Sequence, residues 1–323
     1  MKQASTAWRD DVSADEARHM ERVTEVITRL QQAKSKRFGQ GRTFHRKSLL
    51  ALEGTLEVLP DLPPHARHGL FAMPGSHRAL VRLSNGGPDV QVNIAPDFRG
   101  FAVKVLDVQG EGAMGGTIDH QDFLMINHDW LPFRGSHDFI DLAEAATGGQ
   151  SAIVMHFIRK HGWFAGWWRL WAVVGAMARK FGGFATDRFN TVAAHACGPY
   201  AVKVRLFPSG TPPRRPWGKD IGQDVRERLA RGPLSWDLVL QFYVDDTTTP
   251  LNDGTKQWPD GETPMVTVAR LTVPKQTGEE RREEIERLKF DPWGGLAAHK
   301  PLGEVMRARK VAYFASQKGR GVL

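Results

Sequence analysis

The chain has 323 residues, of which 41% are hydrophobic and 25% charged, a composition typical of a soluble globular protein with a large core. Lysine and arginine exceed aspartate and glutamate by 44 to 36, which gives a net charge of +8. These basic residues are scattered and no DNA-binding motif accompanies them, so a nucleic acid is not an expected partner.

Cysteine usage and the apolar stretches narrow the class further. Cys197 is the single cysteine, which excludes an intramolecular disulfide and favours a reducing compartment. We interpret Cys197 as a buried, inert thiol, because nucleophilic use would need a third group beside the nearby His195. The N-terminus lacks the apolar segment of a secretory signal, and Arg169 interrupts the longest apolar stretch, residues 163–178. We expect a cytoplasmic protein without a membrane span.

Apolar periodicity predicts the elements in chain order. Residues 14–33 have helical spacing, which predicts an amphipathic helix within an N-terminal arm of residues 1–40. From Lys47 the apolar residues alternate as in a strand, with Gly54 as a bulge. Further alternating runs predict strands at 79–83, 100–105, 201–207, 236–244 and 266–273. Helices are predicted at 277–288 and 302–316. The pattern indicates an α+β chain built on a β-barrel, with one domain over residues 1–323.

A helical insert is expected at residues 135–183, between the early and the late strands. It contains a cluster of large apolar residues: Trp163, Phe164, Trp167, Trp168, Leu170, Trp171 and Phe181. We expect this cluster to pack as core against the barrel. The alternative is that these amphipathic aromatics rest at a membrane interface or line an apolar channel.

Few residues stand out for their chemistry. Arg82 lies in the middle of a predicted strand, where a charge needs an anionic partner. His45 begins the first strand, with Arg42 three residues before it. Tyr313 follows Arg309 by one helical turn, on the same helix face. A nearby cation favours an ionised phenol, and a phenolate is an axial ligand of haem iron. A helix tyrosine taken alone is far more commonly structural.

Eight segments resemble segments of catalases, in the same order along the chain. They are GRTFHRK (41–47), ALVRLSN (79–85), DFRGFAVKV (97–105), QDFLMINHDWLPF (121–133), WDLVLQFYV (236–244), TKQWPDGETPMVTVARLTVPKQ (255–276), FDPWGGLAAHKPLG (290–303) and RKVAY (309–313). DFRGFAVKV is the most specific of these matches. The resemblance implies an antiparallel eight-stranded β-barrel of catalase type, with the helical insert and terminal helices around it.

The resemblance also implies the residues on the reactive side of a haem. His45 resembles the distal general acid/base, and Ser84 the residue that hydrogen-bonds its other ring nitrogen and so sets its tautomer. Asn127 resembles the distal donor that orients peroxide. A different alignment of that segment would transfer this role to Asp122 or His120.

On the other side of the haem, the resemblance implies that Tyr313 is the axial iron ligand, supported by Arg309. The other cofactor-binding residues that it implies are Arg42, Arg82 and Arg320, on the haem propionates, together with Phe44 and Phe133. The implied cofactor is haem b. A buried haem propionate would supply the anionic partner that mid-strand Arg82 needs.

Two departures from the catalase pattern bear on the substrate. Phe44 replaces a residue that is usually small and β-branched, and Phe314-Ala315-Ser316 follows the tyrosine where catalases have P-D-T or similar. The chain is also short, and by this resemblance we expect it to be without the long arm, wrapping segment and C-terminal domain of large catalases. These differences resemble compact catalase-related proteins, some of which act on fatty-acid hydroperoxides.

The sequence thus leads to three functional hypotheses. The first is a haem peroxidase or catalase-like oxidoreductase that uses His45 and Tyr313 to cleave the O–O bond of a peroxide. The second retains the haem and acts on a lipid or other organic hydroperoxide. The third, from another class, is a non-enzymatic haem carrier or sensor. Expected partners are the peroxide, a small-molecule electron donor or lipid hydroperoxide, a homo-oligomer, and a membrane surface in weak contact.

Overall fold

The computed structural model describes residues 2–323 except 91, 94, 96, 148–149 and 217. Its helices are α1 (Glu16–Phe38), α2 (Ser136–Thr147), α3 (Gln150–His161), α4 (Trp163–Met177), α5 (Ile221–Arg231), α6 (Arg282–Arg287) and α7 (Glu304–Arg320). Its strands are β1 (Ser48–Val58), β2 (Gly75–Asn85), β3 (Arg99–Glu111), β4 (Thr117–Ile126), β5 (Phe189–Asn190), β6 (His195–Cys197), β7 (Tyr200–Pro208), β8 (Leu234–Phe242) and β9 (Met265–Val273).

Eight of these strands form a closed antiparallel barrel. The strand order is β5-β4-β3-β2-β1-β9-β8-β7, and β5 closes the ring because it pairs with both β4 and β7. The short β6 adds to β7 as a hairpin outside the ring. Closure removes the exposed strand edges that an open sheet would present. The predicted barrel is confirmed, although β4 was not predicted as a strand.

Side-chain alternation divides the barrel into two faces. Phe101 and Trp236 lie fully buried in the barrel interior, with their ring centroids 5.2 Å apart. Leu83 faces the same interior, so its neighbours Arg82 and Ser84 lie on the outer face, because successive residues of a strand alternate. The outer face of β2 therefore directs these two polar groups toward the helices.

Two strand expectations need correction. Gly54 is not a bulge, since it pairs in register with Ala79, and the register shift of β1 lies between Ser48 and Leu50. A Cβ at Gly54 would lie 2.7 Å from the Thr272 carbonyl oxygen, so the glycine permits close approach of β9 instead. Strand β4 shows no alternation of apolar and polar residues in the sequence, because several of its residues are polar. In the structure one of them, Asp122, pairs with Lys104 directly across from it on β3 (2.6 Å).

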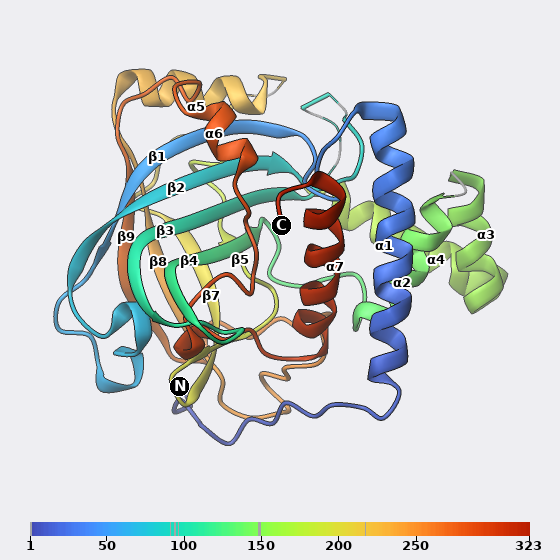
Figure 1. The fold of residues 1–323 in the computed structure, drawn as a ribbon, viewed down its shortest axis with the longest axis horizontal. Coiled ribbons are helices and arrows are strands. Elements are labelled where there is room, and N and C mark those ends of the chain that lie inside the picture. The colour runs from blue at the N-terminus through green and yellow to red at the C-terminus, as the bar shows by residue number, and fades with distance from the viewer. Residues whose placement is uncertain (1, 91, 94, 96, 148–149, 217) are drawn as a thin grey trace.

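Three helices cover one side of the barrel (Figure 1). Helix α7 lies beside the barrel, and α1 packs against α7 and α2. The predicted N-terminal helix is confirmed as α1, whose apolar stripe Val23, Val26 and Ile27 is buried against Ile140 of α2 and Ala308 of α7. The arm thus forms the outer wall of the space between α7 and the barrel.

The helical insert is also confirmed, as α2, α3 and α4, but the part of its aromatic cluster that lies on α4 is not core. Figure 1 shows α3 and α4 projecting beyond α1 and α2, on the side away from the barrel. Phe164, Trp168 and Trp171 are 88%, 77% and 64% exposed. The expectation that this cluster packs against the barrel is therefore wrong for the residues of α4, because among the described helices α4 packs extensively against α3 alone. Phe181, which follows α4, does pack against the barrel core.

No helix in the described part of the chain combines the length and apolarity needed to cross a bilayer.

Candidate active site

A cavity lies between the outer face of the barrel and helices α1, α2 and α7. Nine of the ten residues singled out in the sequence line it: Arg42, Phe44, His45, Arg82, Ser84, Phe133, Arg309, Tyr313 and Arg320. They come from four separate stretches of the chain, which barrel closure and the docking of α7 bring together. The rest of the lining is mainly apolar, including Ile27 of α1, Ile140 of α2 and Ala312 of α7.

His45 is held tightly against the barrel wall. Its Nδ1 lies 3.0 Å from Ser84 Oγ, and its backbone N–H donates to the Gly86 carbonyl (2.9 Å). Its φ of 50° lies in the left-handed region, which costs a non-glycine residue energy and is concentrated at functional sites. A Cβ at Gly100 would collide with His45 Nδ1 and Ser84 Oγ, so only glycine admits the ring here. Nε2 is left for the cavity.

Burial determines the protonation state of His45. The His45 ring lines the cavity. Burial, together with the nearby cations Arg82 and Arg309, lowers the pKa of His45 to about 3. A charged imidazole is disfavoured where water is scarce and cations are near. His45 is therefore a neutral imidazole at neutral pH, able to accept a proton.

Tyr313 is positioned by the arginine one turn before it. Arg309 Nη2 donates to Tyr313 Oη (3.2 Å), and its guanidinium carbon lies 5.4 Å from the Tyr313 ring centroid. Helical spacing alone produces this pair, because residues four apart share a face of α7. His195 of β6 lies within electrostatic range of Arg309; burial, with that cation, lowers the pKa of His195 to about 3.

Three arginines converge at one end of the cavity on a carboxylate that sequence reasoning missed. Glu286 of α6 accepts from Arg82 Nε (2.7 Å) and Arg42 Nη1 (3.0 Å). Arg42 and Arg320 both donate to the Leu288 carbonyl, at 2.9 and 3.3 Å. Arg82 and Arg42 hold the pKa of Glu286 at about 2, although its burial acts in the opposite direction. Two of the three guanidinium groups thus bond one carboxylate and the third lies beside them, which leaves two positive charges for another anion.

The aromatic wall of the cavity joins the barrel to the insert. Phe44 packs against Phe139 of α2, with centroids 5.3 Å apart, and Phe139 contacts Phe133 at 5.5 Å. Phe44 belongs to the buried cluster between α1, α2 and α7. Among the described residues of α3 and α4 none lines the cavity, so the tryptophans there are not the wall of an apolar channel.

Asn127 does not line the cavity. Its Oδ1 accepts from the Arg99 backbone N–H (2.7 Å), which caps the edge of the barrel. The two alternatives are also engaged elsewhere: Asp122 accepts from Lys104, and His120 pairs with Asp119 (2.8 Å). None of the three residues proposed for the distal amide role reaches the space that His45 faces.

The cavity instead contains a different amide, Asn190 of β5. Directly paired residues carry their side chains on the same face of a sheet. The pairs Gly100 with Ile126 and Ile126 with Asn190 therefore put the Asn190 side chain on the face against which the His45 ring lies. Asn190 Oδ1 accepts from Arg205 Nε (2.7 Å), which leaves its Nδ2 for the cavity. No sequence signal marked this two-residue strand.

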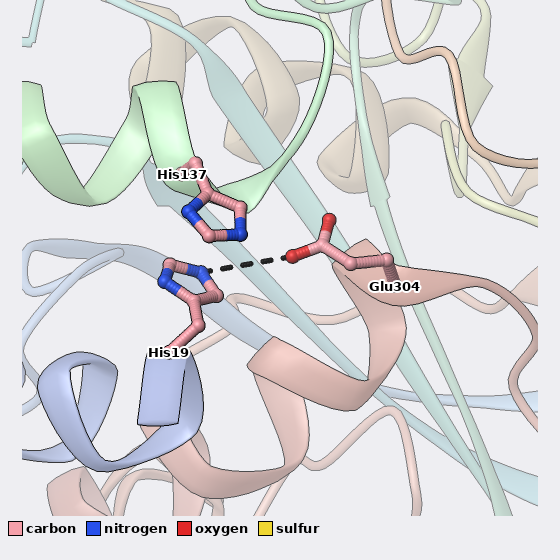
Figure 2. Close-up of side chains that lie close together, drawn as sticks. All are labelled: His19, His137 and Glu304. Carbon is pink, nitrogen blue, oxygen red and sulfur yellow. Dashed lines mark ion pairs between the residues drawn. The ribbon is translucent and has the colours of Figure 1, made fainter. Parts of the chain in front are cut away.

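A second polar cluster borders the cavity where α1, α2 and α7 meet (Figure 2). His19, His137 and Glu304 have ligand-type atoms within 4.8 Å of one another. The two rings stack with centroids 3.4 Å apart, so their in-plane lone pairs run side by side and do not converge. The Ser136 hydroxyl, 2.6 Å from His19 Nε2, also bonds the Glu304 carboxylate. We interpret this cluster as a hydrogen-bonded junction of three helices.

Comparison with solved structures agrees with the fold of this chain. No family model and no curated protein sequence matches this chain. Among solved structures, a fungal catalase superimposes with a TM-score of 0.67 at 16% identity, over 99% of this chain and 64% of the catalase. Catalase A from Saccharomyces cerevisiae gives 0.68 at 16%, over 99% and 67%. A bacterial catalase gives 0.63 at 15%, over 99% and 63%.

These likenesses establish the class of fold. The chain has the catalase fold, a closed eight-stranded antiparallel barrel with seven α-helices in its described part. It spans about two thirds of the length of the catalases that it resembles. The predicted fold class and the predicted likeness to the catalase fold are confirmed.

Proposed function

We propose that this protein is a haem-dependent hydroperoxidase. One observation carries the proposal: the His45–Ser84 pair and the Arg309–Tyr313 pair line a single cavity. A non-enzymatic haem carrier or sensor would need Tyr313 and the arginines but not a neutral, hydrogen-bonded histidine facing the same space. The catalase fold of the chain agrees with an oxidoreductase.

The residues of the cavity fit haem in three respects. An arginine-held tyrosine hydroxyl offers an oxygen ligand to iron. The cavity wall is largely apolar, as a porphyrin ring requires. Two unbalanced positive charges among Arg42, Arg82 and Arg320 match two propionates. Haem b, when bound, would supply a redox-active iron that accepts oxidising equivalents from peroxide.

The roles of this chain's own residues follow from their contacts. His45 Nε2 would take the proton from one peroxide oxygen and return it to the other, which assists cleavage of the O–O bond. The Ser84 hydrogen bond at Nδ1 would hold the ring in the tautomer that this transfer needs. Asn190 Nδ2, in place of Asn127, would donate to the peroxide and orient it.

A second candidate keeps this chemistry and changes the peroxide. Phe44, Phe133 and Phe139 form an aromatic wall beside His45, which favours an organic hydroperoxide over hydrogen peroxide. Each buried CH₂ of a long-chain substrate would contribute roughly 0.8 kcal/mol of binding free energy. Comparing kcat/KM for hydrogen peroxide and a fatty-acid hydroperoxide decides between them. Rapid oxygen evolution from hydrogen peroxide with no consumption of the lipid would reject this second candidate.

The test of the proposed function is an absorption spectrum of the haem-loaded protein, followed by peroxide assays. Tyr313→Phe should lose the high-spin ferric tyrosinate spectrum or the haem itself. Tyr200→Phe is the matched control, because Tyr200 lies on β7 and does not line the cavity. An unchanged spectrum in Tyr313→Phe would reject the ligand assignment, and failure of the wild-type protein to bind haem would reject the function.

A further inference from the structure

The exposed face of α4 is the largest unexplained feature of the molecule. Phe164, Trp168 and Trp171 recur at i, i+4 and i+7, and so lie on one face of the helix. Trp163 beside them is 61% exposed. A contiguous exposed aromatic surface on a globular protein marks a contact with something else.

The opposite face of α4 is the one used for folding. Gly166 is buried, and a Cβ there would lie 2.6 Å from the Phe157 carbonyl oxygen of α3. This close approach fixes α4 on α3 and turns the aromatic residues outward. The exposure of the aromatic face therefore follows from the packing of α4 on α3, and α4 need not rearrange to present it.

The charge around this face has one sign. Between Ala145 and Thr186 the sequence contains no aspartate or glutamate. The basic residues of this stretch are Arg159, Lys160, Arg169, Arg179 and Lys180. Lys160 pairs with Asp138 and Asp141 of α2, whereas the other four form no ion pair with any carboxylate in the described part of the chain. The segment around α4 therefore carries more positive than negative charge.

We propose that α4 docks this protein onto the surface of an anionic lipid bilayer. Tryptophan and phenylalanine with a polar edge are favoured at the headgroup level, where one end of the ring is apolar and the other wet. A helix with such a face lies in the plane of the interface, and neighbouring lysine and arginine attract anionic headgroups. With 15 residues, α4 is only about 22 Å long, too short to span a hydrocarbon core of about 30 Å.

Charge favours a bilayer over a second copy of the chain. A symmetric contact through α4 would bring the four unpaired basic side chains of each copy together. An anionic bilayer instead supplies the opposite charge along with apolar depth. This docking does not depend on the proposed peroxide chemistry, and its test uses no peroxide.

The experiment is co-sedimentation of the full chain with vesicles. One set is phosphatidylcholine alone, and the other contains 30% phosphatidylglycerol. Wild-type protein should bind the anionic vesicles at least tenfold more tightly than the neutral ones, and high salt should remove the difference, since headgroup attraction is screened. The triple variant Phe164→Ser/Trp168→Ser/Trp171→Ser should lose binding at least tenfold. Met73→Ser, which alters an equally exposed apolar residue far from α4 in sequence, is the control and should bind normally.

A second variant separates loss of contact from loss of structure. Arg169→Glu/Arg179→Glu retains the aromatic face and should weaken binding to anionic vesicles at least tenfold. Absence of wild-type binding to anionic vesicles would overturn the proposal, as would undiminished binding of both variants. Sedimentation velocity distinguishes the remaining case: a wild-type dimer that the triple variant dissociates, with no vesicle binding, would make this face a contact between copies.

Discussion

The cavity and the α3–α4 hairpin are both rich in aromatic and basic residues, but these residues are buried around the cavity and exposed on the hairpin. Around the cavity, Arg82 is only 3% exposed and is paired with Glu286. On the hairpin, Trp168 is 77% exposed, and Arg169 has no carboxylate partner within the described structure. A similar composition therefore serves a buried site in one region and an open surface in the other. What separates them is how many elements surround each residue.

The largest expected difference between the two regions is in their response to low pH, because the buried histidines belong to the barrel and the cavity. Burial lowers the pKa of His45 and His195 to about 3, and of His299 to about 4. The unfolded chain takes up these protons near pH 6.5 and the folded chain does not. The free energy of unfolding should therefore be fully present above pH 6.5 and decline below it, by up to about 1.4 kcal/mol per pH unit for each histidine.

Urea unfolding at pH values from 7 to 5 measures this dependence. His45→Gln should make the slope shallower by up to about 1.4 kcal/mol per pH unit, the contribution of one histidine. A slope that is identical in His45→Gln and in the wild type would contradict the burial of His45 as a neutral ring.

Tryptophan substitutions compare the two regions directly. Trp236 is fully buried in the barrel, and its Nε1 donates to the Phe184 carbonyl (3.0 Å). Trp236→Ala should lower the free energy of unfolding by about 3–5 kcal/mol. Trp168→Ala should change it by less than about 0.5 kcal/mol. Denaturant titration of both variants decides this, and a large loss in Trp168→Ala would mean that α4 is part of the core after all.

The third prediction concerns catalysis at the cavity. His45→Ala should retain haem and lose peroxide turnover by about 10²-fold or more, as expected when a general acid/base is removed. His77→Ala, on the far half of β2, is the control and should keep full activity. Full activity in His45→Ala would place the proton carrier elsewhere.

The smallest expected effect distinguishes the two asparagines. Asn190→Ala should reduce turnover about 5–10-fold, the effect of losing one hydrogen bond of about 1 kcal/mol to the substrate. Asn127→Ala should leave turnover unchanged and lower stability by about 1 kcal/mol, because its carboxamide caps the Arg99 backbone N–H. The reverse result would restore the role that the sequence implied for Asn127.

The sequence by itself determined the barrel, its helical cover and most of the residues around the cavity. The alternation in β1 and the helical spacing between Arg309 and Tyr313 are local patterns. Each predicts the structure correctly because each lies within one regular element. The order of the catalase-like segments was enough to group His45 with Tyr313, which lie 268 positions apart along the chain.

Tertiary structure alone decided which groups meet. Glu286 reaches Arg82 from a six-residue helix within the predicted helix 277–288, and the local pattern does not say which strand residue it meets. Asn190 enters the cavity from a two-residue strand that is too short to show a period. The exposure of Trp168 could not be predicted from the sequence either. An apolar helix has the same sequence pattern whether or not neighbouring elements cover it. Burial depends on packing partners that are distant in sequence. In this chain α4 packs extensively against α3 alone among the described helices, so its other side stays exposed.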